Sequence, residues 1–244
     1  MQTTFPTVTV LAIPFVNTTA ATLLSHLQNR IDQHQNTFVV TANPEIVMYA
    51  HQHADYRRLI QGADYITPDG VGILDGAKIL GQPLAERITG FDTLQALLSW
   101  GNAHHKSAYF VGAKPEVIDF LRDILPDRYP DLDIVGLRDG YFQNDQDVVA
   151  DIETQQPDMV FAALGFPKQE RFIANYRHVT HGLWMGVGGS FDVLAGTVVR
   201  APAFWQKHHL EWFYRTVKDP KRLKRIAVIP HYLKLVRQQA KQQK

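Results

Sequence analysis

The sequence predicts an α/β fold, in which a mainly parallel sheet with flanking helices is followed by a C-terminal helical appendage. Three observations predict it. Short apolar runs rich in β-branched residues alternate with segments of helical periodicity. The runs are apolar throughout, which is typical of strands buried on both faces of a parallel sheet. This alternation stops after about Gly196, where only helical patterns continue.

The expected elements follow one another in a regular order. Apolar runs too short for amphipathic helices predict strands at Val8–Ile13, Phe38–Thr41, Tyr65–Thr67, Ala108–Val111, Ile134–Gly136, Met159–Leu164 and Leu183–Val187. Helical periodicity predicts helices at Thr19–Gln33, Pro44–His51, Phe91–Ala103, Pro115–Leu125, Asp145–Gln155 and Lys168–Tyr176. Pro115 and Pro167 follow turn-prone residues, which fits proline in a first helical turn. Such strand–helix alternation is typical of a Rossmann-like sheet.

The C-terminal part of the chain differs from the rest. Two further helices are expected there, at Trp205–Lys218 and Lys221–Gln239, with a helix cap and a first-turn proline between them. Pro230 is expected to kink the second helix near its middle. We therefore divide the chain into an α/β catalytic domain over residues 1–195 and a basic, amphipathic helical appendage over residues 196–244.

The formal net charge of +1 hides an uneven distribution. Residues 1–200 hold 14 Lys and Arg against 22 Asp and Glu, a net charge of −8, whereas residues 201–244 hold 11 against 2, a net charge of +9. An acidic body with a basic tail indicates an anionic partner, unless the charges form only a solvated helical face. Aromatic residues among the cations, such as Trp212 and Tyr232, suit a membrane interface, so we expect a membrane surface and no nucleic acid.

The composition and the motifs exclude several classes of protein. With 45% hydrophobic and 20% charged residues the chain is not disordered, and without cysteine it has no disulfide, cysteine-bound metal or thiol nucleophile. No apolar run reaches the 18 residues of a membrane span, and the N-terminus lacks the features of a signal peptide. We therefore expect a cytoplasmic protein. The histidines have no HExxH spacing, and no GxSxG elbow occurs.

Polar, turn-rich segments follow four of the expected strands. They are Ala42–Glu45, Pro68–Gly72, Gly165–Glu170 and Gly188–Asp192. Because ligands bind outside the carboxyl ends of strands in an open α/β sheet, we expect these segments to converge on one edge. There, Asp69 is either part of a structural Pro-Asp-Gly turn or a carboxylate that takes a proton from a hydroxyl. Arg87 suits a phosphate or carboxylate, or else a surface ion pair.

Other residues allow close approach of an anion. Gly188 and Gly189 permit backbone contact with a phosphate, although tight strand–helix packing explains them as well, and no GxGxxG or Walker pattern is present. Gln169 lies in the first turn of an expected helix, where the neighbouring Glu170 also suits the helix dipole. In the appendage, arginines at helical spacings of three or four offer forks that suit a diphosphate.

Seven segments in order resemble the WecG/TagA/CpsF family of glycosyltransferases (family 26), over roughly residues 8–237. They are Thr41–Glu45, Pro68–Gly72, Arg87–Asp92, Phe110–Pro115, Ala163–Glu170, Gly186–Asp192 and Leu210–Arg215. The resemblance implies inverting transfer of N-acetylmannosamine from UDP-ManNAc to the 4-hydroxyl of GlcNAc-diphosphoundecaprenol, in wall teichoic acid linkage-unit synthesis. The alternatives are UDP-ManNAcA or another UDP-sugar as the donor, or a non-catalytic nucleotide-binding module that recruits partners to membranes.

The resemblance also implies roles for individual residues. It makes Asp69 the general base and lets Thr41, Asn43, Arg87 and Gln169 line the same pocket. The residues that would hold the diphosphate are Arg215, Arg222 and Arg225. It implies no metal and no other cofactor, and a protein peripherally attached to the inner face of the membrane. A homo-oligomer is compatible with it.

Overall fold

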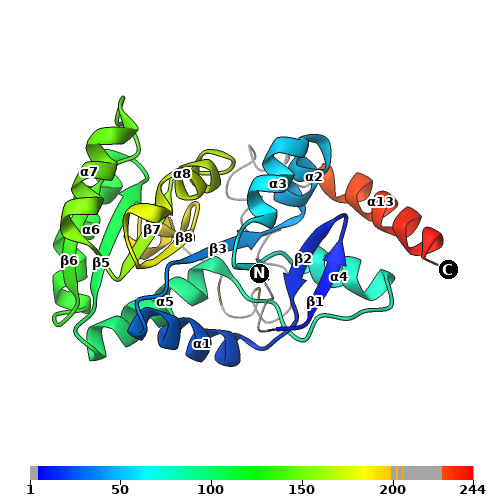
Figure 1. The fold of residues 1–244 in the computed structure, drawn as a ribbon, viewed down its shortest axis with the longest axis horizontal. Helices are drawn as coiled ribbons and strands as arrows, with labels where there is room; N and C mark the ends of the chain where they lie inside the picture. The colour runs from blue at the N-terminus through cyan, green and yellow to red at the C-terminus, as the bar shows by residue number, and fades with distance from the viewer. Residues whose placement is uncertain (1–4, 199–201, 203–204, 206–226, 244) are drawn as a thin grey trace.

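The structure, a computed structural model, describes residues 5–198, 202, 205 and 227–243 (Figure 1). Its centre is a sheet of six parallel strands in the order β4-β3-β8-β7-β5-β6. The strands are β3 (Thr37–Ala42), β4 (Tyr65–Pro68), β5 (Ser107–Gly112), β6 (Asp133–Arg138), β7 (Met159–Ala163) and β8 (Leu183–Gly186). Each contains most of a run predicted from the sequence, which confirms the α/β fold with a parallel sheet.

Helices cover both faces of this sheet (Figure 1). One face carries α1 (Ala20–Asp32), α5 (Gly90–Ala103), α6 (Pro115–Arg128) and α9 (Ser190–Leu194). The other carries α2 (Pro44–Gln52), α7 (Asp145–Gln155) and α8 (Lys168–Tyr176), which a single 3-10 turn, η1 (Arg177–Val179), follows. Successive residues of β3 enter the two cores in turn, Phe38 on one side and Val39 on the other. This alternation explains why most residues of the strands are apolar.

The predicted strand Val8–Ile13 is wrong as a member of the parallel sheet. The run forms parts of two strands, β1 (Thr7–Val10) and β2 (Ile13–Val16), which pair in a separate antiparallel hairpin. Leu11 and Ala12 form its two-residue turn with φ of 47° and 70°. A turn with two positive φ values usually holds asparagine or glycine, so these residues give no turn signal in the sequence.

Two helices on the β3 and β4 side were not predicted. They are α3 (Ala54–Gln61) and α4 (Val71–Ile79). Glycine lowers helix propensity, and α4 contains Gly72 and Gly76. Gly76 allows close packing, since a Cβ atom there would overlap the hydroxyl of Tyr232 from the C-terminal helix.

The C-terminal helix α13 (Val228–Gln242) packs on α2 and α4. It begins later than predicted, so Pro230 lies in its first turn, where proline is tolerated, and not in the middle of a longer helix. Tyr232 and Val236 are fully buried, and the Gln239 side chain bonds the β1–β2 hairpin at Leu11 N (2.9 Å) and Thr9 O (3.0 Å). Of the predicted helix Trp205–Lys218, only Trp205 lies within the described residues.

Candidate active site

The four polar segments predicted to converge do so. They follow β4, β3, β8 and β7, which are consecutive in the sheet. Neighbouring strands lie about 4.8 Å apart, so the four carboxyl ends span only about 15 Å. Asp69 follows β4, Asn43 follows β3, Gly188 follows β8 and Gln169 follows β7. The candidate site is therefore one continuous row of loops at one edge of the sheet.

Asp69 and Arg87 form the part of this row nearest the sheet margin. The Asp69 amide donates to Ala42 O (3.1 Å), and the Ile88 amide donates to Pro68 O (3.1 Å), so both segments are fixed to strand ends. Arg87 Nε donates to the Asp69 carbonyl oxygen, and Arg87 Nη2 lies 3.7 Å from Asp69 Oδ1. The side chains are 22% exposed for Arg87 and 30% for Asp69. A carboxylate and a cation are thus held together within reach of a ligand.

Glycines let the loops after β3 and β4 touch. A Cβ atom at Gly70 would lie 2.7 Å from Pro44 Cδ, and one at Gly72 would lie 2.8 Å from Pro44 Cγ. Asn43 caps α2, because its Oδ1 accepts a hydrogen bond from the Ile46 amide (3.0 Å). The turn that holds Asp69 therefore rests on the capped start of α2. This packing gives the Pro-Asp-Gly segment a structural role beside any chemical one.

Thr41 is buried and ties three elements together. Its Oγ1 donates to Gly186 O at the end of β8 (3.1 Å), and the residue is 8% exposed. A Cβ atom at Gly90, the first residue of α5, would lie 3.0 Å from the same oxygen. Thr41 thus fixes the end of β8 against β3 and the start of α5. Thr41 therefore lies near the carboxyl end of β3, next to Asn43 and the row of loops.

Gln169 is also buried, at 4% exposed, and bonds the glycine turn after β8. Its Oε1 accepts from the Gly188 amide (3.0 Å), while its Nε2 donates to Glu170 Oε1 (2.8 Å). Gly188 has φ of 51°, and Gly189 follows as the residue before α9. The Gly188 amide, which the sequence suggested for an anion, is used inside the protein in this structure.

The other sequence predictions concern the arginines of the appendage, a metal site and a membrane span. Arg215, Arg222 and Arg225 lie outside the described residues, and their predicted role stays a prediction. Among the residues that the structure does describe, no group of three or more His, Asp or Glu side chains is placed to hold a metal ion. None of the described helices is long and apolar enough to cross a membrane.

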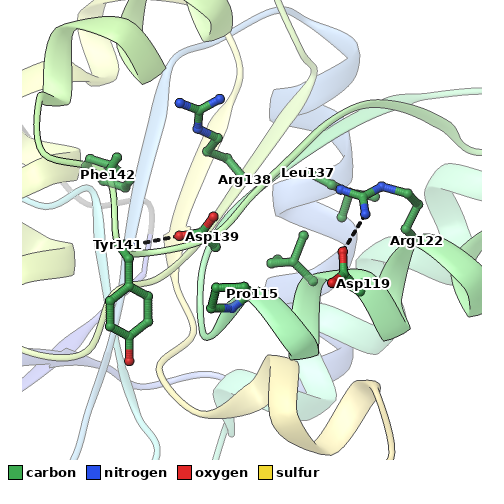
Figure 2. Close-up of a pocket in the computed structure, with 9 residues that line it drawn as sticks. Pro115, Asp119, Arg122, Leu137, Arg138, Asp139, Tyr141 and Phe142 are labelled. Carbon is green, nitrogen blue, oxygen red and sulfur yellow. Dashed lines mark hydrogen bonds and ion pairs between the residues drawn. The ribbon is translucent and has the colours of Figure 1, made fainter.

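A cavity of about 350 Å³ lies at the carboxyl end of β6, where no site was predicted (Figure 2). Its walls are the start of α6 and the turn after β6. Asp139 Oδ1 accepts from the Tyr141 amide (2.8 Å), and Gly140 donates to Ala113 O after β5 (2.9 Å). Lys168 Nζ lies 4.6 Å from the Phe142 ring centroid and so connects this turn to the start of α8. The polar turn that follows β6 is the sequence signal from which this cavity could have been predicted.

Comparisons with known proteins identify the family. The family model of the glycosyl transferase WecG/TagA/CpsF family matches residues 8–244. Three relatives each carry the name N-acetylglucosaminyldiphosphoundecaprenol N-acetyl-beta-D-mannosaminyltransferase. The one from Bacillus spizizenii is 40% identical over 92% of this chain and 88% of its own length. The one from Bacillus subtilis is 38% identical (98% and 94%), and one from Staphylococcus aureus is 37% identical (93% and 90%). The chain therefore belongs to the WecG/TagA/CpsF family of glycosyltransferases.

Proposed function

We propose that this chain moves N-acetylmannosamine from a UDP-linked donor to the 4-hydroxyl of GlcNAc-diphosphoundecaprenol, with inversion, in wall teichoic acid linkage-unit synthesis. The observation that carries the proposal is the identity of 37 to 40%, over 88 to 94% of their length, to proteins named for this transfer. The paired Asp69 and Arg87 at the strand edge support it, because such a transfer needs a base and a cation close together.

Asp69 acts as the general base. The acceptor hydroxyl oxygen forms a bond to the anomeric carbon of the donor sugar as Asp69 takes its proton. The bond between that carbon and the diphosphate oxygen breaks, and the electron pair leaves with UDP. The acceptor attacks the face opposite UDP, so the configuration inverts. The 30% exposure of the Asp69 side chain supports this role, since the acceptor must reach the carboxylate from outside.

Cationic groups stabilise the departing diphosphate. Arg87 lies beside Asp69 and carries a planar fork that suits phosphate oxygens. In this proposal Arg215, Arg222 and Arg225 add further forks from the appendage. No protonated leaving group is needed, because the charge that develops on the diphosphate is met by fixed cations.

We further propose that the protein works at the anionic inner face of the membrane. The exposed side of α13 supports this: Lys234, Arg237 and Lys241 are exposed there, and the helix contains no acidic residue. A basic residue near an anionic bilayer contributes about 1 kcal/mol. Flotation with phosphatidylglycerol vesicles should recover the protein at low salt and less of it at high salt, because salt screens the attraction. Equal flotation with phosphatidylcholine vesicles would contradict an electrostatic attachment.

One experiment tests the chemistry and the donor together. The protein is incubated with UDP-ManNAc, UDP-GlcNAc or UDP-ManNAcA and a short-chain GlcNAc-diphosphate lipid, and the products are analysed by mass spectrometry. A disaccharide lipid from UDP-ManNAc alone is expected. A product only from UDP-ManNAcA would assign another donor, and no product from any donor would contradict the proposed activity.

A further inference from the structure

Glu170 is a carboxylic acid buried in the wall of the candidate site. It is 1% exposed and occupies the first turn of α8. An acidic residue in a first turn interacts favourably with the helix dipole. An exposed acidic residue would make the same interaction without the free-energy cost of removing the carboxylate from water. Burial raises the pKa of Glu170, and the hydrogen bond from Gln169 acts against this rise. The cost of burying this carboxyl group therefore calls for another explanation.

The hydrogen bonds around Gln169 supply one. Glu170 Oε1 accepts from Gln169 Nε2 (2.8 Å), and Gln169 Oε1 accepts from the Gly188 amide (3.0 Å). A carboxyl oxygen that carries no proton only accepts hydrogen bonds, so Glu170 Oε1 selects the NH₂ side of the Gln169 amide. The opposite orientation would place NH₂ against the Gly188 N–H and one oxygen against another. Glu170 thus determines which atom of Gln169 faces the glycine turn.

The glycine turn is held from two sides. Gln169 bonds Gly188 from the α8 side, and Thr41 donates to Gly186 O from β3 (3.1 Å). Gly186 also makes room for the amide, since a Cβ atom there would lie 2.7 Å from Gln169 Nε2. These contacts place residues 186 to 189 in the middle of the row of loops, two strands from Asp69. A small shift of this turn would move whatever ligand rests on it.

We propose that Glu170 is a positioning residue that acts through Gln169 to hold the Gly186–Gly189 turn in the shape that receives the diphosphate of the nucleotide donor. This inference rests on the proposed function for the identity of the nucleotide. Glu170 touches neither substrate nor reacting atoms. It fixes the amide, the amide fixes the Gly188 N–H, and the turn presents its backbone to the ligand.

The second neighbour of Glu170 is Tyr56 of α3. Glu170 Oε2 and the Tyr56 hydroxyl are both buried, and the hydrogen bond between these two side chains acts with that from Gln169 against the rise in the pKa of Glu170. Burial, and next the charge of Glu170, raise the pKa of Tyr56. Replacing Glu170 by glutamine, a neutral amide of the same shape, removes the ionisable group whose charged form burial disfavours.

Glu170→Gln is therefore the decisive variant. We expect its unfolding temperature to equal or exceed that of the unchanged protein, while the Kd for UDP rises about three- to tenfold, the value of one hydrogen bond. The KM for the donor should rise in parallel, with the KM for the lipid acceptor unchanged. In amide hydrogen exchange by NMR, Gly188 should lose protection. Glu153→Gln, the same change at an exposed position on α7, is the matched control and should alter none of these.

A double-mutant cycle tests whether Glu170 acts through Gln169. Gln169→Ala alone should weaken UDP binding at least as much as Glu170→Gln, and adding Glu170→Gln to it should change the Kd less than about twofold. A full additional loss would overturn the proposal, as would a Glu170→Gln protein that is destabilised but binds UDP normally. If the unchanged protein fails to bind UDP, the proposed donor is wrong, and the Gly188 exchange measurement still decides the role of Glu170.

Discussion

Two pairs of residues at the same sheet edge differ in their exposure to solvent. Asp69 and Arg87 are 30% and 22% exposed, whereas Gln169 and Glu170 are 4% and 1% exposed. The first pair is fixed to neighbouring strand ends by backbone hydrogen bonds, and its side chains are partly exposed. In the second pair, the Gln169 amide forms hydrogen bonds with Glu170 and with the Gly188 N–H. We infer that exposure separates the groups that meet substrate from those that shape the loops.

The largest test of this distinction is Asp69→Asn. We expect kcat to fall about 10²- to 10⁴-fold, because the amide cannot take the acceptor proton. The Kd for UDP and the unfolding temperature should hardly change, since an exposed pair 3.7 Å apart contributes at most about 1 kcal/mol. Turnover with the lipid acceptor, calorimetric UDP titration and thermal unfolding measure these quantities.

The matched control for Asp69→Asn is Asp55→Asn on α3. Asp55 also pairs with an arginine, Arg171, at 2.7 Å, but it lies on α3, which follows α2 and not a strand. This variant should retain full turnover. Near-normal turnover of Asp69→Asn would instead show that the Asp69 carboxylate has only a structural role in the Pro-Asp-Gly turn.

Arg87→Lys should have the next largest effect. Lysine keeps the charge but loses the fork and the Nε hydrogen bond to the Asp69 carbonyl. We expect kcat/KM to fall about tenfold to a hundredfold, less than the loss of about 10²- to 10³-fold when a donor to a developing negative charge is removed outright, because lysine keeps the charge. The kcat/KM of Arg87→Ala should fall further than that of Arg87→Lys. Equal activity of the Lys variant and the unchanged protein would mean that charge alone matters at this position.

Much of the fold could be predicted because burial on both faces leaves a strong pattern. The strands β3, β7 and β8 are buried along their whole length and β5 is buried after its first residue, while α7 and α8 have the predicted bounds. The hairpin could not be predicted, since Leu11 and Ala12 adopt positive φ without a turn residue to signal it. Its partner is remote in sequence: Gln239 of α13 bonds its backbone at Leu11 and Thr9. A contact over such a separation leaves no local signal.

The position of the candidate site could be predicted from the sequence, but the orientation and burial of its side chains could not. The rule that ligands bind at the carboxyl ends of strands placed Asp69, Asn43 and Gln169 correctly along one edge. It says nothing of the direction in which a side chain points or how deeply it is buried. Thr41 and Gln169 are expected to line the pocket beside Arg87, and the structure adds that both side chains are buried. For Glu170 the sequence indicates only that an acidic residue there also suits the helix dipole, and its side-chain hydrogen bond with Gln169 is visible only in the structure.

The smallest expected effect, on the buried side, is that of Thr41→Val. Valine keeps the shape of threonine but cannot donate to Gly186 O, so the end of β8 loses one of its hydrogen bonds. We expect stability to fall by about 1 kcal/mol, the usual net value of a hydrogen bond, which lowers the unfolding temperature by about 2 to 4 °C for a chain of this size. Turnover should fall only a few-fold, because Gln169 still holds the turn at Gly188.

Thr41→Ser is the control for this variant, since serine keeps the hydroxyl group and should keep the stability. The two sides of the sheet edge then show opposite patterns: Asp69→Asn loses turnover with little change in stability, and Thr41→Val loses stability with little change in turnover. A Thr41→Val protein that is as stable as the Ser variant but has lost most of its kcat would break this distinction. It would place the Thr41 hydroxyl among the groups that meet substrate, despite an exposure of only 8%.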